Sequence, residues 1–73
     1  HVCRIAINHR NTKNMIGQFA SVLGSADLNI ANMTNTSKGD YAYSLFYLDT
    51  HLPEAVLDTL KNIEGVLKVR VIK

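Results

Sequence analysis

The sequence predicts an α+β fold in which four antiparallel strands form one sheet and two helices cover one of its faces. Four segments alternate apolar and polar residues with the period of a strand, and two longer segments carry an apolar stripe with the period of a helix. The turn-forming run at residues 37–40, Ser-Lys-Gly-Asp, separates two of the strand segments, as in a hairpin. The predicted order along the chain is therefore β-α-β-β-α-β.

The first half of the chain supplies a strand and a helix. Over residues 2–8, Cys3, Ile5 and Ile7 share one face of an extended segment, which is typical of a half-buried strand. From residue 14 to residue 26, apolar residues recur at steps of three and four, which predicts an amphipathic helix. The residues in this stripe are Met15, Ile16, Phe19, Val22 and Leu23.

The second half completes the pattern. Residues 28–36 and 41–48 are predicted strands that pair as antiparallel neighbours. Pro53 is tolerated in a first helical turn, and the second amphipathic stripe runs from there to Gly65. Residues 66–72 alternate apolar with basic side chains and form the fourth strand. This order is the ferredoxin-like βαββαβ arrangement, a sandwich of one four-stranded antiparallel sheet and two helices on one face.

The third predicted strand has two different faces, and only one of them can meet the helices. One face carries Ala42, Ser44, Phe46 and Leu48, and the other carries Tyr41, Tyr43, Leu45 and Tyr47. Phe46 and Leu48 suit the core, so the tyrosines are expected on the face of the sheet that no helix covers.

Composition places the chain among ordinary soluble domains. Its 73 residues form one domain (1–73), and with 47% hydrophobic and 19% charged residues it has no apolar stretch long enough for a membrane helix. The single cysteine, Cys3, excludes an internal disulfide and favours a reducing, cytoplasmic setting. Eight basic and six acidic residues are scattered along the chain, so no nucleic-acid partner is expected. Because the chain opens with His1 and enters a strand pattern at once, we expect a domain excised from a larger enzyme.

No catalytic or metal-binding pattern emerges from the sequence. His1, His9 and His51 lie on separate elements, and a lone cysteine cannot form a CxxC site, so no metal is expected. The acids fall mostly at turns and on helix surfaces, and no nucleophile is paired with an oriented base. The glycines form no phosphate-binding loop. The chain is therefore predicted to lack an active site and to hold no cofactor.

A polar cluster at one edge is the best candidate for function. The loop at residues 8–14 leads into the first helix, whose unpaired backbone amides can receive a carboxylate. An asparagine, Asn29, opens the second strand, and a carboxamide offers both a donor and an acceptor, as a zwitterionic amino acid requires. The alternative is that Asn11 and Asn14 only cap the helix and that Asn29 closes a turn.

Four stretches together resemble the ACT domain at the carboxyl end of D-3-phosphoglycerate dehydrogenases, the enzymes that open serine biosynthesis. The stretches are residues 14–18 (Asn-Met-Ile-Gly-Gln), 28–33 (Leu-Asn-Ile-Ala-Asn-Met), 38–43 (Lys-Gly-Asp-Tyr-Ala-Tyr) and 63–70 (Ile-Glu-Gly-Val-Leu-Lys-Val-Arg). The resemblance implies a regulatory domain without a catalytic site of its own. It also implies a parent enzyme whose separate catalytic part would use NAD.

The resemblance implies an effector site as well. In serine-regulated members, L-serine lies between two ACT domains and is held by a His-x-Asn pair in the first loop and by an asparagine that opens the second strand. His9, Asn11 and Asn29 match these positions, and Asn14, Met15 and Ile16 would offer backbone contacts. Two such domains lie side by side through the first helix and second strand, so the resemblance implies a homodimer with an eight-stranded sheet.

The chain departs from the family pattern where the first loop ends. Many ACT domains carry Pro-Gly there, whereas this chain has Lys13 and Asn14. Asparagine is the residue after glycine that best tolerates a left-handed backbone.

Two other interpretations stay open at the level of sequence. The RRM shares the βαββαβ order and reads RNA with aromatic side chains on its open sheet face, but the first strand here offers no aromatic residue. A ligand-free dimerisation module would keep the paired interface and leave His9, Asn11 and Asn29 without a ligand.

Overall fold

The structure, a computed structural model, describes residues 2–72 and has the predicted order of elements. The elements are β1 (Cys3–Arg10), α1 (Met15–Ser25), β2 (Ile30–Lys38), β3 (Tyr41–Leu48), α2 (Glu54–Lys61) and β4 (Val66–Ile72). The strands form one sheet in the order β2-β3-β1-β4, and every neighbouring pair is antiparallel. The ferredoxin-like prediction is confirmed.

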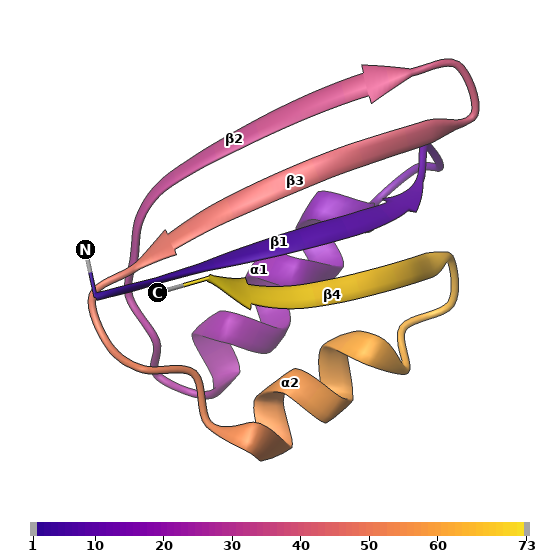
Figure 1. Cartoon of the computed structure of the whole chain (residues 1–73). Coiled ribbons are helices and arrows are strands. Elements are labelled where there is room, and N and C mark those ends of the chain that lie inside the picture. Colours follow the sequence, from indigo (N-terminus) through magenta and orange to yellow (C-terminus); the bar gives the residue numbers. More distant parts are fainter. Residues whose placement is uncertain (1, 73) are drawn as a thin grey trace.

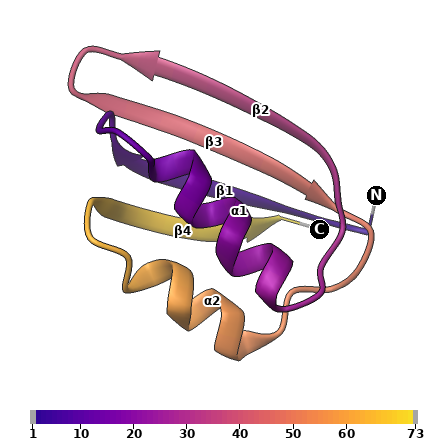
Figure 2. The ribbon, with the colours of Figure 1, turned by 180° about the vertical axis from the view of Figure 1, so that it is seen from behind.

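Both helices lie on the same face of the sheet and leave the other face open (Figures 1 and 2). Their apolar stripes close over the inward side chains of the strands, so that Ile5, Phe19, Phe46 and Leu60 are fully buried. Phe19 packs edge-on against Phe46, with ring centroids 6.1 Å apart. Neither helix among residues 2–72 has the length and apolar character needed to cross a membrane.

Strand β2 lies at an edge of the sheet, where neither helix covers it (Figure 2). Every residue of β2 after Ile30 is exposed, including Met33 at 39%. One side of this strand pairs with β3, and the other side keeps its backbone groups free of any partner strand in the described chain. An edge of this length is a template for pairing with another strand.

Three element boundaries differ from the predicted ones. Strand β1 continues through His9 and Arg10, because these residues pair with Ala42 and Tyr41 of β3. Strand β2 begins at Ile30 and reaches Lys38, so it is displaced by two residues from the predicted range. Helix α2 ends at Lys61, where the next residues form a tight turn closed by a glycine with positive φ.

Candidate functional site

The loop between β1 and α1 is bonded to the turn between β2 and β3. The backbone amide of Asn11 donates to the carbonyl oxygen of Asp40 at 2.8 Å. The Asn11 side chain donates from Nδ2 to the carbonyl oxygen of Gly39 at 3.1 Å. Asn11 is therefore fixed at the far end of the edge strand β2, with its carboxamide exposed. Its side chain bonds to this turn, and the structure does not show it capping α1.

His9 lies on the helix face of the sheet and is only 2% exposed. Its Nδ1 donates to the carbonyl oxygen of Arg10 at 2.9 Å, and its Nε2 shares a hydrogen bond of 2.7 Å with the hydroxyl of Ser44. The ring packs edge-on against Phe19, with centroids 5.0 Å apart. In a single copy of the chain, both ring nitrogens are thus already used.

A hydrogen bond continues from this buried pair to the surface. The Ser44 hydroxyl donates to Oδ1 of Asn35 at 2.9 Å, and Asn35 is an exposed residue of the edge strand β2. Sequence reasoning missed both Ser44 and Asn35. The available signal was Ser44 itself, a hydroxyl among the apolar residues of the inward face of β3, where a buried hydroxyl requires a partner.

The start of α1 combines a strained backbone with free helical amides. Asn14 precedes the helix with φ 65° and ψ 16°, in the left-handed region that asparagine tolerates. Asn14 occupies the N-cap position of α1, as the capping interpretation expected, but its side chain makes no capping hydrogen bond. Met15 is buried and Ile16 half-buried, and their backbone amides belong to the first turn, whose donors have no partner inside the helix.

Asn29 lies at the opposite end of the sheet, where it is exposed. The side-chain Nδ2 of Asn29 donates to Oδ2 of Asp49 at 2.6 Å, and the backbone carbonyl oxygen of Asn29 accepts from the backbone amide of Asp49 at 3.3 Å. These bonds join the entrance of β2 to the exit of β3. Asp49 is thus a further residue of this region that sequence reasoning did not identify.

Within one copy, the structure brings His9 and Asn11 together but not Asn29. Asn11 binds the turn before β3 and Asn29 binds the residue after it, and an eight-residue strand is roughly 26 Å long. A single chain therefore cannot place all three side chains around one small molecule. A site that uses all three side chains would therefore need Asn29 from a second copy.

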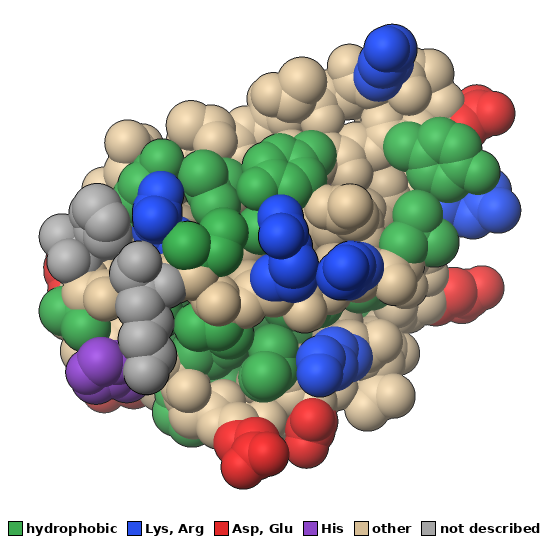
Figure 3. Space-filling view, viewed as in Figure 1, with side chains coloured by type: hydrophobic (Ala, Val, Ile, Leu, Met, Phe, Trp, Pro, Cys, Tyr) green, Lys and Arg blue, Asp and Glu red, His purple; other side chains and the backbone are tan. Residues whose placement is uncertain are grey.

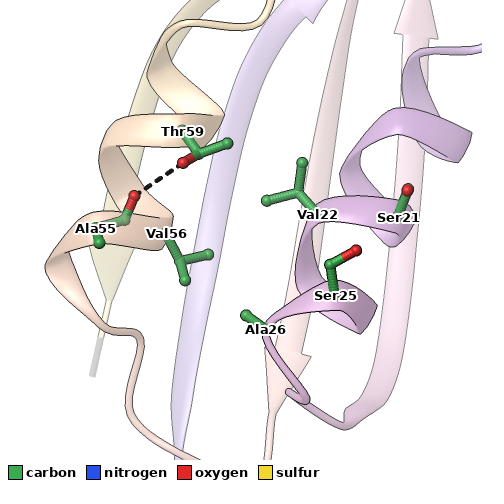
Figure 4. A pocket seen from close by; sticks show the side chains of 7 residues that line it. All are labelled: Ser21, Val22, Ser25, Ala26, Ala55, Val56 and Thr59. Atoms are coloured by element: carbon green, nitrogen blue, oxygen red, sulfur yellow. Dashed lines mark hydrogen bonds between the residues drawn. The ribbon is translucent and has the colours of Figure 1, made fainter.

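The described chain has no cluster of metal ligands, and it has a buried thiol and a groove between the helices. Among residues 2–72 no three His, Cys, Asp or Glu side chains come together as metal ligands. The thiol of Cys3 is buried and donates to the carbonyl oxygen of Thr50 at 3.3 Å. A groove of about 330 Å³ between the helices has no charged residue in its lining, which is Ser21, Val22, Ser25, Ala26, Ala55, Val56 and Thr59 (Figure 4).

Comparisons with known proteins agree on the fold. No protein-family model matches the chain. It is 31% identical over 70 residues to D-3-phosphoglycerate dehydrogenase of Bacillus subtilis, a match that covers 93% of this chain and 13% of that protein. The chain therefore spans only a small part of this relative.

Two solved structures have the same architecture. The ACT domain of GTP pyrophosphokinase from Chlorobium tepidum superposes with a TM-score of 0.80 at 19% identity, covering 96% of this chain and 95% of that one. The ligand-free regulatory subunit of aspartate kinase from Thermus thermophilus has a TM-score of 0.78 at 8% identity, covering 97% of this chain and 50% of that one.

Proposed function

Since this chain has the fold of an ACT domain and resembles a segment of D-3-phosphoglycerate dehydrogenase, we propose that it is a regulatory domain that binds a small amino acid, with L-serine the first candidate. The effector would lie between two copies of the chain, and the domain itself would perform no chemistry. In this proposal the parent is a cytoplasmic phosphoglycerate dehydrogenase, and NAD belongs to its catalytic part.

The observation that carries the proposal is the position of two asparagines at opposite ends of one unpaired edge. Asn29 directly precedes β2, and Asn11 is bonded to Gly39, which directly follows it. When an edge strand pairs antiparallel with its own copy, a two-fold axis relates the two strands, and the start of one lies beside the end of the other. Such pairing brings Asn29 of one copy to Asn11 of the other, twice per dimer.

The chemistry at the resulting junction suits a zwitterion. The exposed carboxamides of Asn11 and Asn29 both donate and accept hydrogen bonds, so they can bind an ammonium, a carboxylate or a hydroxyl. The first-turn amides of α1, from Met15 and Ile16, add donors for a carboxylate. The left-handed backbone at Asn14 turns the loop into that helix immediately before these amides.

His9 has a different position from the two asparagines. A direct bond to the effector, which the family resemblance implies, requires the imidazole to give up either Ser44 or the Arg10 carbonyl oxygen. While the observed bonds persist, His9 acts as a positioning residue, because it supports Ser44 and through it Asn35 on the pairing edge.

Binding at a junction of two copies gives a route to regulation. An effector that contacts both copies stabilises the paired state by its differential affinity for it. Coupling of this kind is typically about 1–3 kcal/mol, which corresponds to a change of roughly 5- to 150-fold in an equilibrium constant.

Calorimetric titration tests the proposal directly. L-serine, glycine, L-alanine and L-aspartate are titrated into the wild-type chain, Asn11→Ala, Asn29→Ala and the control Asn62→Ala. Asn62 is an exposed asparagine directly after α2, and its side chain donates to the Asp58 carbonyl oxygen at 2.8 Å. We expect serine heat from the wild type and Asn62→Ala, and loss of that heat in the other two variants. Equal heat from all four chains would overturn the proposed site.

A mixing experiment tests whether the site is shared between copies. In a dimer of Asn11→Ala with Asn29→Ala, one site loses both asparagines while the other keeps both. An equimolar mixture of the two inactive variants should therefore recover about a quarter of the wild-type sites. A site built within one copy predicts no recovery at all.

A further inference from the structure

The face of the sheet that the helices leave open carries only positive charge. Strand register places five basic side chains on this face, namely Arg4, Arg10, Lys38, Lys68 and Arg70. Pairing of copies through the β2 edge need not cover this face. None of the four strands contains an aspartate or a glutamate. Figure 3 shows Lys and Arg spread over this face, with the acidic side chains at its margins.

Aromatic rings lie between these cations. Tyr41 pairs with Arg10 on one side and with Lys38 on the other, and the guanidinium carbon of Arg10 lies 6.0 Å from the centroid of the Tyr41 ring. Tyr43 follows two residues along the same face of β3, between Asn8 and Thr36. Rows of rings with cations, a carboxamide and hydroxyls on either side are typical of surfaces that bind nucleic acid bases and phosphates.

A hollow on this face gives room for a planar ring. It has a volume of about 320 Å³ and lies among Tyr41, Tyr43 and the exposed side chain of Leu67, with Asn8 and Lys38 at its margin. A bulge in the pairing of β1 with β4, after Asn8, leaves Leu67 without a cross-strand partner. The hollow therefore combines an apolar floor with a donor, an acceptor and a cation.

The spacing of the basic side chains on this face favours an extended polyanion as the ligand. Arg4 and Arg10 are six residues apart on β1, roughly 20 Å, so one small anion cannot contact both. Two copies that met through this face would bring like charges together, so a second copy is not the expected occupant. Lys68 and Arg70, two residues apart, are separated by about 7 Å, close to the spacing of phosphates along an extended single strand. A duplex keeps its bases stacked inside, out of reach of Tyr43.

We propose that the open face of the sheet binds single-stranded nucleic acid, with phosphates on the five basic side chains and a base against Tyr41 and Tyr43. This proposal does not depend on effector binding or on pairing of copies. It also reverses the expectation from the sequence, where the same cations are scattered along the chain and only the fold gathers them.

Fluorescence anisotropy with a labelled oligouridylate of roughly 12 nucleotides tests the proposal. We expect binding to the whole chain at low salt, with the logarithm of affinity falling by about 0.7 per neutralised phosphate for each unit of log salt. Arg70→Glu should weaken binding roughly tenfold and reduce that slope by about 0.7 or more. Lys61→Glu, a charge reversal on α2 beside Leu67 and Lys68, should change both by clearly less. Should Arg70→Glu fail to fold by circular dichroism, Lys68→Gln provides the same comparison.

Substitutions of Tyr43 test separately whether a base stacks on its ring. Tyr43→Leu should lower the affinity roughly 5- to 150-fold, and Tyr43→Phe should retain it, because stacking needs the ring and not the hydroxyl. Absence of binding at low salt, equal losses in Arg70→Glu and Lys61→Glu, or equal affinity of Tyr43→Leu and wild type would overturn the proposal. Displacement by polyglutamate as effective as by unlabelled oligouridylate would assign the face to an acidic polypeptide and overturn it as well.

Discussion

The hydrogen bond between His9 and Ser44 makes the core sensitive to the loss of a single hydroxyl. Both residues are essentially buried, and Nε2 of His9 has no other partner among the described residues. Ser44→Ala removes the hydroxyl and leaves a buried ring nitrogen unsatisfied, which we expect to lower the free energy of unfolding by about 1–3 kcal/mol. Urea denaturation measures this loss. Ser25→Ala, at an exposed residue at the end of α1, is the control and should change stability by less than about 0.5 kcal/mol.

Two glycines should respond to alanine with opposite signs. Gly65 has φ +97°, and a Cβ there would lie 3.3 Å from both the sulfur and the terminal carbon of Met15. Gly65→Ala should therefore destabilise the chain by about 1 kcal/mol or more. Gly24 lies within α1 with nothing within 4 Å of an added Cβ, so Gly24→Ala should stabilise the helix by up to about 1 kcal/mol. Thermal unfolding of the two variants in the same buffer checks the sign of each change.

At the scale of the element, the proposed association of two copies depends on the edge strand β2. Thr34 is at the middle of Ile30–Lys38 and is exposed, so a two-fold axis through the strand centre places it opposite its own copy. Like charges directly opposite each other destabilise a strand pair, whereas opposite charges stabilise it. Thr34→Lys and Thr34→Glu should each weaken dimerisation in analytical ultracentrifugation, and an equimolar mixture should restore it. Two variants that stay monomeric when mixed would rule out pairing centred on Thr34.

The elements could be predicted from the sequence because their periodicities are uninterrupted, but the site could be predicted only in part. The pattern of Cys3, Ile5 and Ile7 continues to His9 with the same parity, so burial of His9 follows once the strand is known to continue. The prediction ended that strand at residue 8 because the polar run from Asn8 resembles a loop. Pairing with β3, a contact between residues more than 30 positions apart, extends it to Arg10.

Long-range contacts account for the other gaps as well. Asn11 and Asn29 were identified as polar residues near helix and strand ends, where local capping was the natural alternative. The bond of Asn11 to Gly39 depends on how β1 pairs with β3, and the bond of Asn29 to Asp49 on how β2 pairs with β3. The basic face arises in the same way, since β1 lies between β3 and β4 in the sheet and both are distant from it in sequence.

For the whole molecule, the limited core makes association an effective source of stability. A chain of this length buries only about 60% of the surface that its unfolded form exposes, so a further interface adds substantially to a small total. The mid-point of thermal unfolding should therefore rise with protein concentration, because only the folded chain presents the β2 edge for pairing.

Binding of the effector to the folded pair should also raise the mid-point of thermal unfolding. A ligand that binds only the folded pair stabilises it by RT ln(1 + [L]/Kd), about 2.7 kcal/mol at a hundredfold excess over Kd. For a domain of 60–100 residues, each kcal/mol raises the unfolding mid-point by about 4–8 °C. L-serine should therefore raise it by about 10–20 °C in the wild type and leave it unchanged in Asn29→Ala. The rise should shrink in Thr34→Lys, whose site residues are intact but whose copies repel each other. Scanning calorimetry with and without serine distinguishes the two variants, since a serine-induced rise of wild-type size in Thr34→Lys would place the effector within a single copy.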